Sequence, residues 1–298
     1  MIKDGILNIN KPEGWTSQDV CAKLKGRLYR KKTGHTGTLD PMATGVLPVC
    51  IGKATRVIQY YDRDKKSYHA GMRLGITTDT LDITGEITQE KPFGHVTEDE
   101  ILRAFSAYRG KVSQIPPKYS ALKINGKRAY DLAREGKDVQ IKPRKIEIFS
   151  NNVTCIDAES GIIEFDVVCS KGTYIRTICD DIGRSLGCGA CMSSLVRTGT
   201  GYFRIKDAYE LSVILEMTDE ELEKCIIDPD VTLEKLGIIH INDNRIIAFT
   251  NGSSTSARTY KVNQETDFDN FYRVYGNGSF LGTGRIKDGE LFPDKILI

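Results

Sequence analysis

A glycine-flanked loop followed by an apolar run constrains the fold of this chain more than any other stretch. Residues 34–41 read Gly-His-Thr-Gly-Thr-Leu-Asp-Pro, and Pro41 disfavours a helical backbone at Asp40. The apolar residues 46–51 that follow are long enough for a buried strand. Positive φ angles or a close approach of another chain segment are expected at three glycines, Gly34, Gly37 and Gly45. We therefore expect Asp40 to stand on a stiff loop anchored to the core.

The role of Asp40 can be interpreted in two ways. A carboxylate displayed on a loop of this kind suits a nucleophile or a general base. An Asp-Pro pair is also a common turn, and by spacing alone Asp40 merely begins that turn. The loop alone does not decide between these two interpretations, and the rest of the chain is needed to do so.

The length and composition suit a globular protein with more than one part. The chain has 298 residues, enough for one large domain plus a small one, or for two domains. Its N-terminus lacks the pattern of a secretion signal, and no apolar run approaches the roughly 20 residues that span a bilayer. We therefore expect a cytoplasmic protein without a membrane partner.

The eight cysteines are scattered, and only Cys188 and Cys191 form a Cys-x-x-Cys pair. A structural zinc site usually needs two such pairs, or one pair with nearby histidines, and the four histidines form no such cluster. Reduced, mostly buried thiols are therefore expected, with no metal.

Charged residues are unevenly distributed. Residues 23–32 hold six basic groups and no acid, and residues 118–145 hold nine basic groups against three acids. Residues 207–235 hold ten acids against two lysines. This segregation favours basic surfaces facing a polyanion, with the acidic segment elsewhere, although a basic run is often only a solvated surface.

Apolar spacing predicts a series of helices. The first begins at Ser17, is capped by Thr16 or Ser17, and buries the face of Val20, Leu24 and Leu28. A capping box at Thr97 opens another, with four residues inward: Ile101, Leu102, Phe105 and Tyr108. Further helices are expected over 53–61, over 129–134 closed by Gly136, over 175–186, and from the capping box at Thr218.

Alternating and apolar runs predict strands. Residues 68–74 alternate with one buried face, and shorter strands are expected around 146–148 and 163–167. From about residue 240, short strand-like runs are separated by frequent glycines. This texture is typical of a small β-barrel-like unit.

Three further residues and one segment are candidates for a site with Asp40. Arg176 falls in the first turn of its expected helix, where the helix dipole disfavours a cation. A carboxylate paired with Arg176 would explain a cation at this position. An unpaired arginine on the surface would also tolerate it. Tyr68 opens a strand, where tyrosine is more often a core residue than a stacking surface. His35 suits a loop hydrogen bond as well as a substrate contact. The basic segment 116–142 contains two tyrosines and suits either packing or RNA binding.

Several long motifs stand in order along the chain: Asn10-Lys11-Pro12 with Gly14, Thr16 and Ser17; residues 34–41 with Ala43-Thr44-Gly45; Lys66-Ser67-Tyr68; Asp79-Thr80-Leu81-Asp82; residues 116–123; Gly172-Thr173-Tyr174-Ile175-Arg176; and Leu195-Val196-Arg197-Thr198. Together they resemble, nearly end to end, the TruB family of bacterial tRNA pseudouridine synthases, which isomerise uridine-55 in the TΨC loop.

The resemblance implies an α/β (α+β) fold with a mixed, mainly antiparallel sheet. It implies a catalytic domain over residues 1–238, a flap over about 116–142 that grips RNA, and a PUA-like RNA-binding β-barrel over 239–298. Two places depart from the family pattern: the turn Phe249-Thr250-Asn251-Gly252, which fits only loosely, and Cys191, where an aromatic residue or histidine is common.

The resemblance also implies roles for individual residues. Asp40 matches the catalytic aspartate, and Arg176 matches the arginine paired with it. Tyr68 matches the tyrosine that stacks on the target base. His35 matches a histidine that fills the space vacated by displaced bases. Tyr174 and Leu195 match residues that line the uridine pocket.

The implied chemistry suits these residues. Pseudouridine formation breaks a C–N glycosidic bond, turns the base and rejoins it through carbon, so one ionised carboxylate suffices and no cofactor is expected. Burial opposes the charge of an aspartate in an apolar pocket, and Arg176 would hold Asp40 ionised. Whether Asp40 attacks the base or acts at the sugar stays open.

The implied partner is the TΨC stem-loop of tRNA, bound by a monomer. Two alternatives remain: an isomerase of the same superfamily that acts on ribosomal RNA, and an RNA-binding or tRNA-folding protein whose active-site loop is vestigial.

Overall fold

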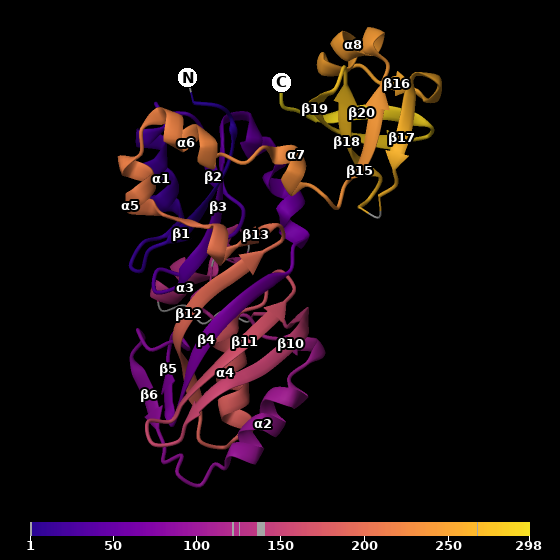
Figure 1. The fold of residues 1–298 in the computed structure, drawn as a ribbon. Coiled ribbons are helices and arrows are strands. Elements are labelled where there is room, and N and C mark those ends of the chain that lie inside the picture. Colours follow the sequence, from indigo (N-terminus) through magenta and orange to yellow (C-terminus); the bar gives the residue numbers. More distant parts are fainter. Residues whose placement is uncertain (1, 121, 125, 136–140, 267) are drawn as a thin grey trace.

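The computed structural model describes residues 2–120, 122–124, 126–135, 141–266 and 268–298 (Figure 1). Gly136, the expected end of the helix at 129–134, lies outside the described residues. So do parts of the expected flap, namely residues 121, 125 and 136–140.

A ten-stranded sheet forms the larger part of the molecule. Its main path runs β14-β1-β3-β12-β4-β11-β10-β7, with β2 paired to β3 and β13 paired to β12. The pairs β1–β14 and β3–β12 are parallel and the other pairs are antiparallel, which confirms a mixed, mainly antiparallel sheet. The strands are β1 (Gly5–Lys11), β2 (Thr33–His35), β3 (Thr44–Ile51), β4 (Lys66–Leu74), β7 (Gly110–Gln114), β10 (Arg144–Asp157), β11 (Ile162–Cys169), β12 (Ala190–Thr200), β13 (Phe203–Arg204) and β14 (Tyr209–Glu210).

Helices cover this sheet in two groups. Figure 1 shows α4 behind the strands, α2 beside it near β10, and α1, α5 and α6 at the β1 end. The helices are α1 (Ser17–Arg27), α2 (Glu98–Ala107), α3 (Ala129–Arg134), α4 (Ile175–Ser185), α5 (Leu211–Glu216), α6 (Asp219–Cys225), α7 (Pro229–Thr232), α8 (Ile246–Thr250) and the 3₁₀ helices η1 (Gly52–Arg63), η2 (Ile205–Asp207), η3 (Asp243–Arg245) and η4 (Ala257–Thr259). None of the helices in the described part of the chain has the length and apolar character needed to span a bilayer.

A six-stranded sheet forms the C-terminal part, in the order β16-β20-β19-β18-β15-β17. Its strands are β15 (Gly237–Ile241), β16 (Thr255–Ser256), β17 (Tyr260–Gln264), β18 (Phe271–Gly276), β19 (Ser279–Lys287) and β20 (Glu290–Ile296). This half-barrel arrangement fits the expected small C-terminal β unit. It packs on η1, where the rings of Phe268 and Phe271 meet Tyr60 edge-on and the Tyr60 hydroxyl lies 2.8 Å from Thr283 Oγ1.

Two short two-stranded sheets are inserted between the main elements. The first pairs β5 (Ile76–Thr78) with β6 (Ile87–Glu90), and its connecting loop carries residues 79–86. The second pairs β8 (Lys123–Ile124) with β9 (Lys127–Arg128), within the segment expected to form the flap.

The helix predictions succeed where a cap and a regular apolar spacing coincide. α1 begins at Ser17 with Thr16 as its N-cap, and Val20, Leu24 and Leu28 are fully buried. The inward position of Leu102 is wrong: its side chain is 43% exposed, because it stands about 100° around the helix from Ile101, which faces the core. Residues 53–61 belong to the 3₁₀ helix η1 rather than an α-helix.

The acidic segment is not wholly apart from the first basic segment, contrary to that part of the expectation. Arg27 forms an ion pair with Asp219 at 2.8 Å, and Lys31 forms one with Asp4 at 2.7 Å. Acidic helix α6 therefore neutralises part of basic helix α1, and at least two of the six basic groups in residues 23–32 are already paired within the protein.

Candidate functional site

The Asp40 loop joins β2 to β3 and is fixed by hydrogen bonds at several backbone positions. Ser17 Oγ accepts a hydrogen bond from Leu39 N at 2.9 Å. The Pro41 carbonyl accepts from Gly14 N at 2.9 Å, and the Asp40 carbonyl accepts from Ala43 N at 3.0 Å. The first turn of α1 and the turn between β1 and α1 thus hold the loop on both sides of Asp40.

Two buried cations beneath the loop were not predicted as site residues. Lys11 Nζ donates to the carbonyls of Pro12, Trp15 and Pro41 at 2.6–3.1 Å, and burial lowers the pKa of Lys11 to about 8. Such a lysine is satisfied only while three carbonyls surround its ammonium group.

The second cation, Arg197, is completely buried, and burial lowers its pKa. Its guanidinium donates to the carbonyls of Gly37 at 3.1 Å, Thr38 at 3.4 Å and Val46 at 2.6 Å. Both cations stand in motifs named above, but buried charges carry no local sequence signal.

The loop glycines serve mainly close packing. Gly45 has φ of 99°, and a Cβ there would lie 2.3 Å from the Arg197 carbonyl oxygen, so only glycine fits. Gly34 and Gly37 do not have positive φ, and at these two positions a close neighbour is the relevant constraint. A Cβ at Gly37 would lie 3.2 Å from Lys66 Nζ, and one at Gly34 would lie 2.9 Å from Ile58 Cδ1.

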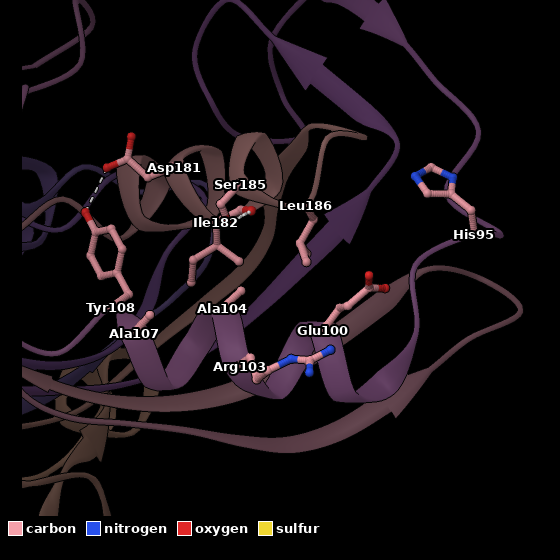
Figure 2. Close-up of a pocket in the computed structure, with 10 residues that line it drawn as sticks. All are labelled: His95, Glu100, Arg103, Ala104, Ala107, Tyr108, Asp181, Ile182, Ser185 and Leu186. Atoms are coloured by element: carbon pink, nitrogen blue, oxygen red, sulfur yellow. Dashed lines mark hydrogen bonds between the residues drawn. The ribbon is translucent and has the colours of Figure 1, made fainter.

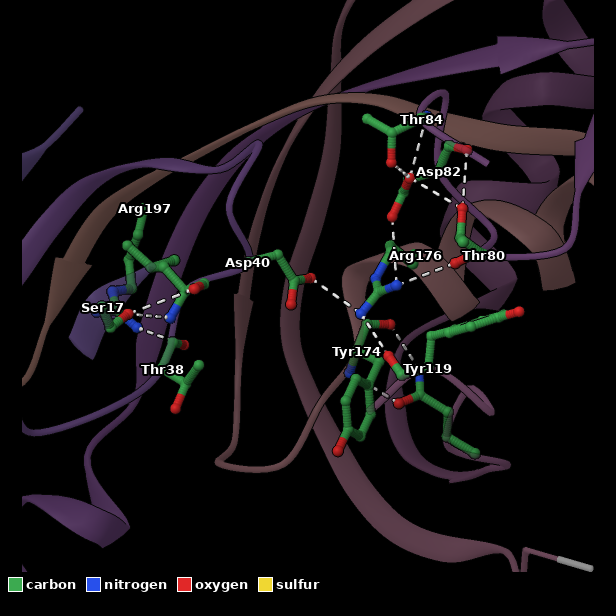
Figure 3. A network of polar contacts seen from close by, with 12 residues as sticks. Ser17, Thr38, Asp40, Thr80, Asp82, Thr84, Tyr119, Tyr174, Arg176 and Arg197 are labelled. Carbon is green, nitrogen blue, oxygen red and sulfur yellow. Dashed lines mark hydrogen bonds and ion pairs between the residues drawn. The ribbon is translucent and has the colours of Figure 1, made fainter. Parts of the chain in front are cut away.

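Asp40 and Arg176 form the ion pair that the sequence predicts. Arg176 Nη2 lies 3.0 Å from Asp40 Oδ2, and Figure 3 shows the two side chains facing each other across the site. Arg176 is the second residue of α4 and its side chain is only 7% exposed, whereas that of Asp40 is 38% exposed. The carboxylate is therefore more open to solvent than an acid inside an apolar pocket would be.

A second carboxylate, Asp82, completes the surroundings of Arg176 and was assigned no role from the sequence. Arg176 Nη1 lies 3.2 Å from Asp82 Oδ2 and donates to the Thr80 carbonyl at 3.0 Å, while Nη2 donates to the Tyr119 carbonyl at 3.0 Å (Figure 3). The Asp82 side chain is 6% exposed. One buried guanidinium thus joins two carboxylates, the β5–β6 loop and the segment that begins the expected flap.

Backbone geometry presents Asp82 to Arg176. Leu81 has φ of 63°, which is unusual for a residue with a branched side chain. Met192 N donates to the Leu81 carbonyl at 3.0 Å, and Thr78 Oγ1 donates to the Asp82 carbonyl at 2.7 Å. The loop is therefore docked on β12, and Asp82 is fixed before it meets Arg176.

A pocket of about 330 Å³ opens beside Asp40 and contains most of the predicted site residues. Its lining is Thr38, Leu39, Asp40, Lys66, Tyr68, Ser120, Leu122, Arg144, Gly172, Thr173, Tyr174, Ile175, Arg176 and Leu195. Tyr68 and Leu195 are each 7% exposed, and burial raises the pKa of Tyr68 to about 12. The Tyr68 hydroxyl therefore stays protonated and neutral at any pH below this pKa.

Tyr174 and His35 occupy different positions relative to this pocket. Tyr174 is the N-cap residue of α4, and the Gln114 side chain bonds its backbone N–H at 2.9 Å and its carbonyl at 3.1 Å. His35 ends β2 and is not among the lining residues. Burial lowers the pKa of His35, which favours a neutral ring.

A second hollow of about 470 Å³ lies between α2 and α4 (Figure 2). It contains the hydrogen bond from the Tyr108 hydroxyl to Asp181 at 2.8 Å. None of the predicted site residues lines it, so the larger hollow is not the candidate active site.

Cys188 and Cys191 are buried free thiols. Burial raises the pKa of both, that of Cys191 to about 11. Raised pKa values favour unreactive thiols, as expected for residues that pack in the core.

Known proteins share this fold along the whole chain. A crystal structure of a Cbf5–Nop10–Gar1 complex superposes with a TM-score of 0.75 at 26% identity, covering 99% of this chain and 84% of that one. A structure of an H/ACA RNP bound to a substrate RNA containing 2′-deoxyuridine gives 0.76 at 25% identity, covering 99% and 85%. The fold is that of the pseudouridine synthases.

Sequence comparison narrows the class to one family. Residues 25–175 match the N-terminal domain of the TruB family pseudouridylate synthases, and residues 176–234 match the tRNA pseudouridylate synthase B C-terminal domain. The tRNA pseudouridine synthase B of Clostridium perfringens strain 13 is 43% identical over 99% of both chains, and that of Clostridioides difficile strain 630 is 42% identical over 94% of both. This chain belongs to the TruB family of pseudouridine synthases.

Proposed function

We propose that this protein isomerises uridine-55 in the TΨC loop of tRNA to pseudouridine, with Asp40 as the catalytic nucleophile or base. The observation that carries the proposal is the Asp40–Arg176 ion pair at the mouth of a pocket lined by Tyr68 and Leu195. The names of the relatives support tRNA as the substrate.

The geometry of Asp40 suits a reacting carboxylate. Arg176 contacts Oδ2, so Oδ1 is available to the nucleoside. Asp40 reaches the pocket while Arg176 stabilises its negative charge from the protein side. The carboxylate either adds to the base or removes a proton from the sugar while the glycosidic bond is broken and the base is turned.

The remaining site residues have roles in holding the extruded nucleoside. Taking a base out of its stack costs a few kcal/mol, and stacking on Tyr68 would return roughly 1–3 kcal/mol. Tyr174 and Leu195 would contact the base from other sides. His35 would fill space vacated in the RNA from outside the pocket.

The flap and the C-terminal unit would bind the rest of the RNA. Segment 116–142 and the PUA-like module over 239–298 would contact phosphates, together with those lysines and arginines of residues 23–32 that have no acidic partner in the described structure. Arg27 and Lys31 are excluded from this set by their ion pairs. The monomeric state stays a prediction.

The direct test incubates the protein with an unmodified tRNA transcript, the same transcript carrying cytidine at position 55, and a ribosomal RNA fragment, and maps pseudouridine in each. We expect modification of position 55 alone. Modification of the ribosomal fragment but not of tRNA would favour the ribosomal isomerase, and binding of tRNA without any modification would favour an RNA-binding protein.

A further inference from the structure

Ser120 places an unpaired hydroxyl in the wall of the active-site pocket. The residue is 4% exposed, and its Oγ is buried without a hydrogen-bond partner among the residues that the structure describes. Native proteins rarely leave a buried hydroxyl unpaired, since the lost hydration is not replaced. An unpaired group that lines a binding pocket is therefore a candidate for a ligand contact.

Backbone contacts hold Ser120 at this place. Its N–H donates to the Lys118 carbonyl at 3.1 Å, and its carbonyl accepts from Tyr130 N at 3.1 Å. The preceding carbonyl, of Tyr119, accepts from Arg176 at 3.0 Å. The guanidinium that pairs with Asp40 thus also positions the residue next to Ser120.

Several other polar groups of the pocket have partners within the protein. Asp40 and Arg176 contact each other, and Thr173 Oγ1 donates to the Ser170 carbonyl at 2.9 Å. The Tyr68 ring and Leu195 supply apolar surface suited to the faces of a base, and they leave its polar edge to be matched. A hydroxyl can donate to a base carbonyl or accept from a ring N–H.

We propose that Ser120 Oγ forms a hydrogen bond with the polar edge of the pyrimidine base that enters this pocket, which makes Ser120 a specificity-determining residue. The proposal rests on the proposed function, because it takes a uridine of RNA as the occupant. Loss of one neutral hydrogen bond changes a specificity constant by about 3- to 10-fold.

The test compares Ser120→Ala, Ser120→Thr and wild type on a T-arm hairpin carrying uridine, 2-thiouridine, 4-thiouridine, 3-deazauridine or 2′-deoxyuridine at the target position. Kd and kcat/KM are measured for each RNA. Thr255→Val is the matched control, because Thr255 in the C-terminal unit is also a buried residue whose hydroxyl has no partner among the described residues.

For wild type, we expect one of the base analogues to give a lower kcat/KM than uridine, and we call this decrease the penalty. We expect Ser120→Ala to lower kcat/KM for uridine by about 3- to 10-fold and to show no further decrease with that analogue. Ser120→Thr and Thr255→Val should keep that penalty. Unchanged base-analogue penalties in Ser120→Ala would overturn the proposal, as would loss of the 2′-deoxyuridine penalty alone, which would place the contact at the ribose. A wild type that binds but does not isomerise uridine would count against the proposed function instead, and the analogue penalties in Kd would then decide the role of Ser120.

Discussion

Replacing Asp82 by asparagine should weaken catalysis far more than RNA binding. The Asp82 carboxylate is buried and contacts Arg176 at 3.2 Å, but it does not line the pocket. Its loss leaves Asp40 as the remaining carboxylate beside Arg176 among the described residues. The substitution therefore acts on Asp40 only through the position of the guanidinium.

The magnitude follows from the hydrogen bonds that Asp82 accepts. Oδ1 accepts from Thr84 N at 3.1 Å and from the Thr80 hydroxyl at 3.0 Å, while Oδ2 faces Arg176. An asparagine amide offers one oxygen, so its NH₂ group must face either the Thr84 N–H or the guanidinium. A buried donor left unpaired costs about 1–3 kcal/mol, and a displacement of about 1 Å in a reacting group costs about 100-fold in rate. We expect kcat to fall about 10- to 100-fold and the free energy of unfolding to fall by about 1–3 kcal/mol.

Single-turnover pseudouridine formation and RNA binding, both measured well below the melting temperature, test this reasoning. Asp79→Asn is the control, because Asp79 stands in the same loop and is exposed, and its carboxylate accepts from Glu86 N at 2.9 Å. We expect Asp79→Asn to keep near wild-type rates. A normal rate in Asp82→Asn, or a loss of RNA affinity equal to the loss of rate, would refute the positioning role.

Two further predictions concern the pocket and the cation beneath the loop. Tyr68→Leu should lose turnover more than RNA affinity, because the stacking contact is made only with an extruded base; a large rise in Kd with unchanged kcat would contradict this role. Activity should fall as the pH rises through about 8, because Lys11 then loses the proton that lets it bond three carbonyls, including that of Pro41. The pKa of Lys11 in the folded protein lies below that of an exposed lysine, so burying its charge opposes folding below pH 8, and this cost is relieved as the pH rises towards 10.5. Unfolding monitored over the same range should therefore show no loss of stability from Lys11, and a rate that stays level from pH 7 to 9 would contradict the prediction.

The sequence predicts elements whose signals are local. Thr16 and Ser17 mark the start of α1, and the apolar residues 46–51 mark β3. Arg176 in a first helical turn predicts a carboxylate partner, because the helix dipole alone disfavours it. Its pairing with Asp40, 136 positions earlier in the chain, follows from the order of the motifs as well as from this electrostatic argument.

The rest of the site depends on tertiary contacts that leave no local pattern. Asp79 and Asp82 stand in the same motif, and the sequence alone does not indicate which of them contacts Arg176. The backbone conformation at Leu81 turns only Asp82 towards Arg176. Lysine and arginine are usually exposed, so the sequence would place Lys11 and Arg197 on the surface. Their burial is tolerable only because backbone carbonyls accept hydrogen bonds from them. The sequence also gives no strand signal for β1, because this strand is buried along nearly its whole length and its two faces do not differ in burial.

The most direct test of the account is single-turnover pseudouridine formation by Asp40→Asn, with tRNA affinity measured in parallel. Asparagine keeps the shape of the side chain and can still accept a hydrogen bond from Arg176, but it carries no negative charge. The account predicts loss of product by at least about 1,000-fold with Kd for tRNA changed by less than about threefold. Pseudouridine formed at position 55 at the wild-type rate would contradict it.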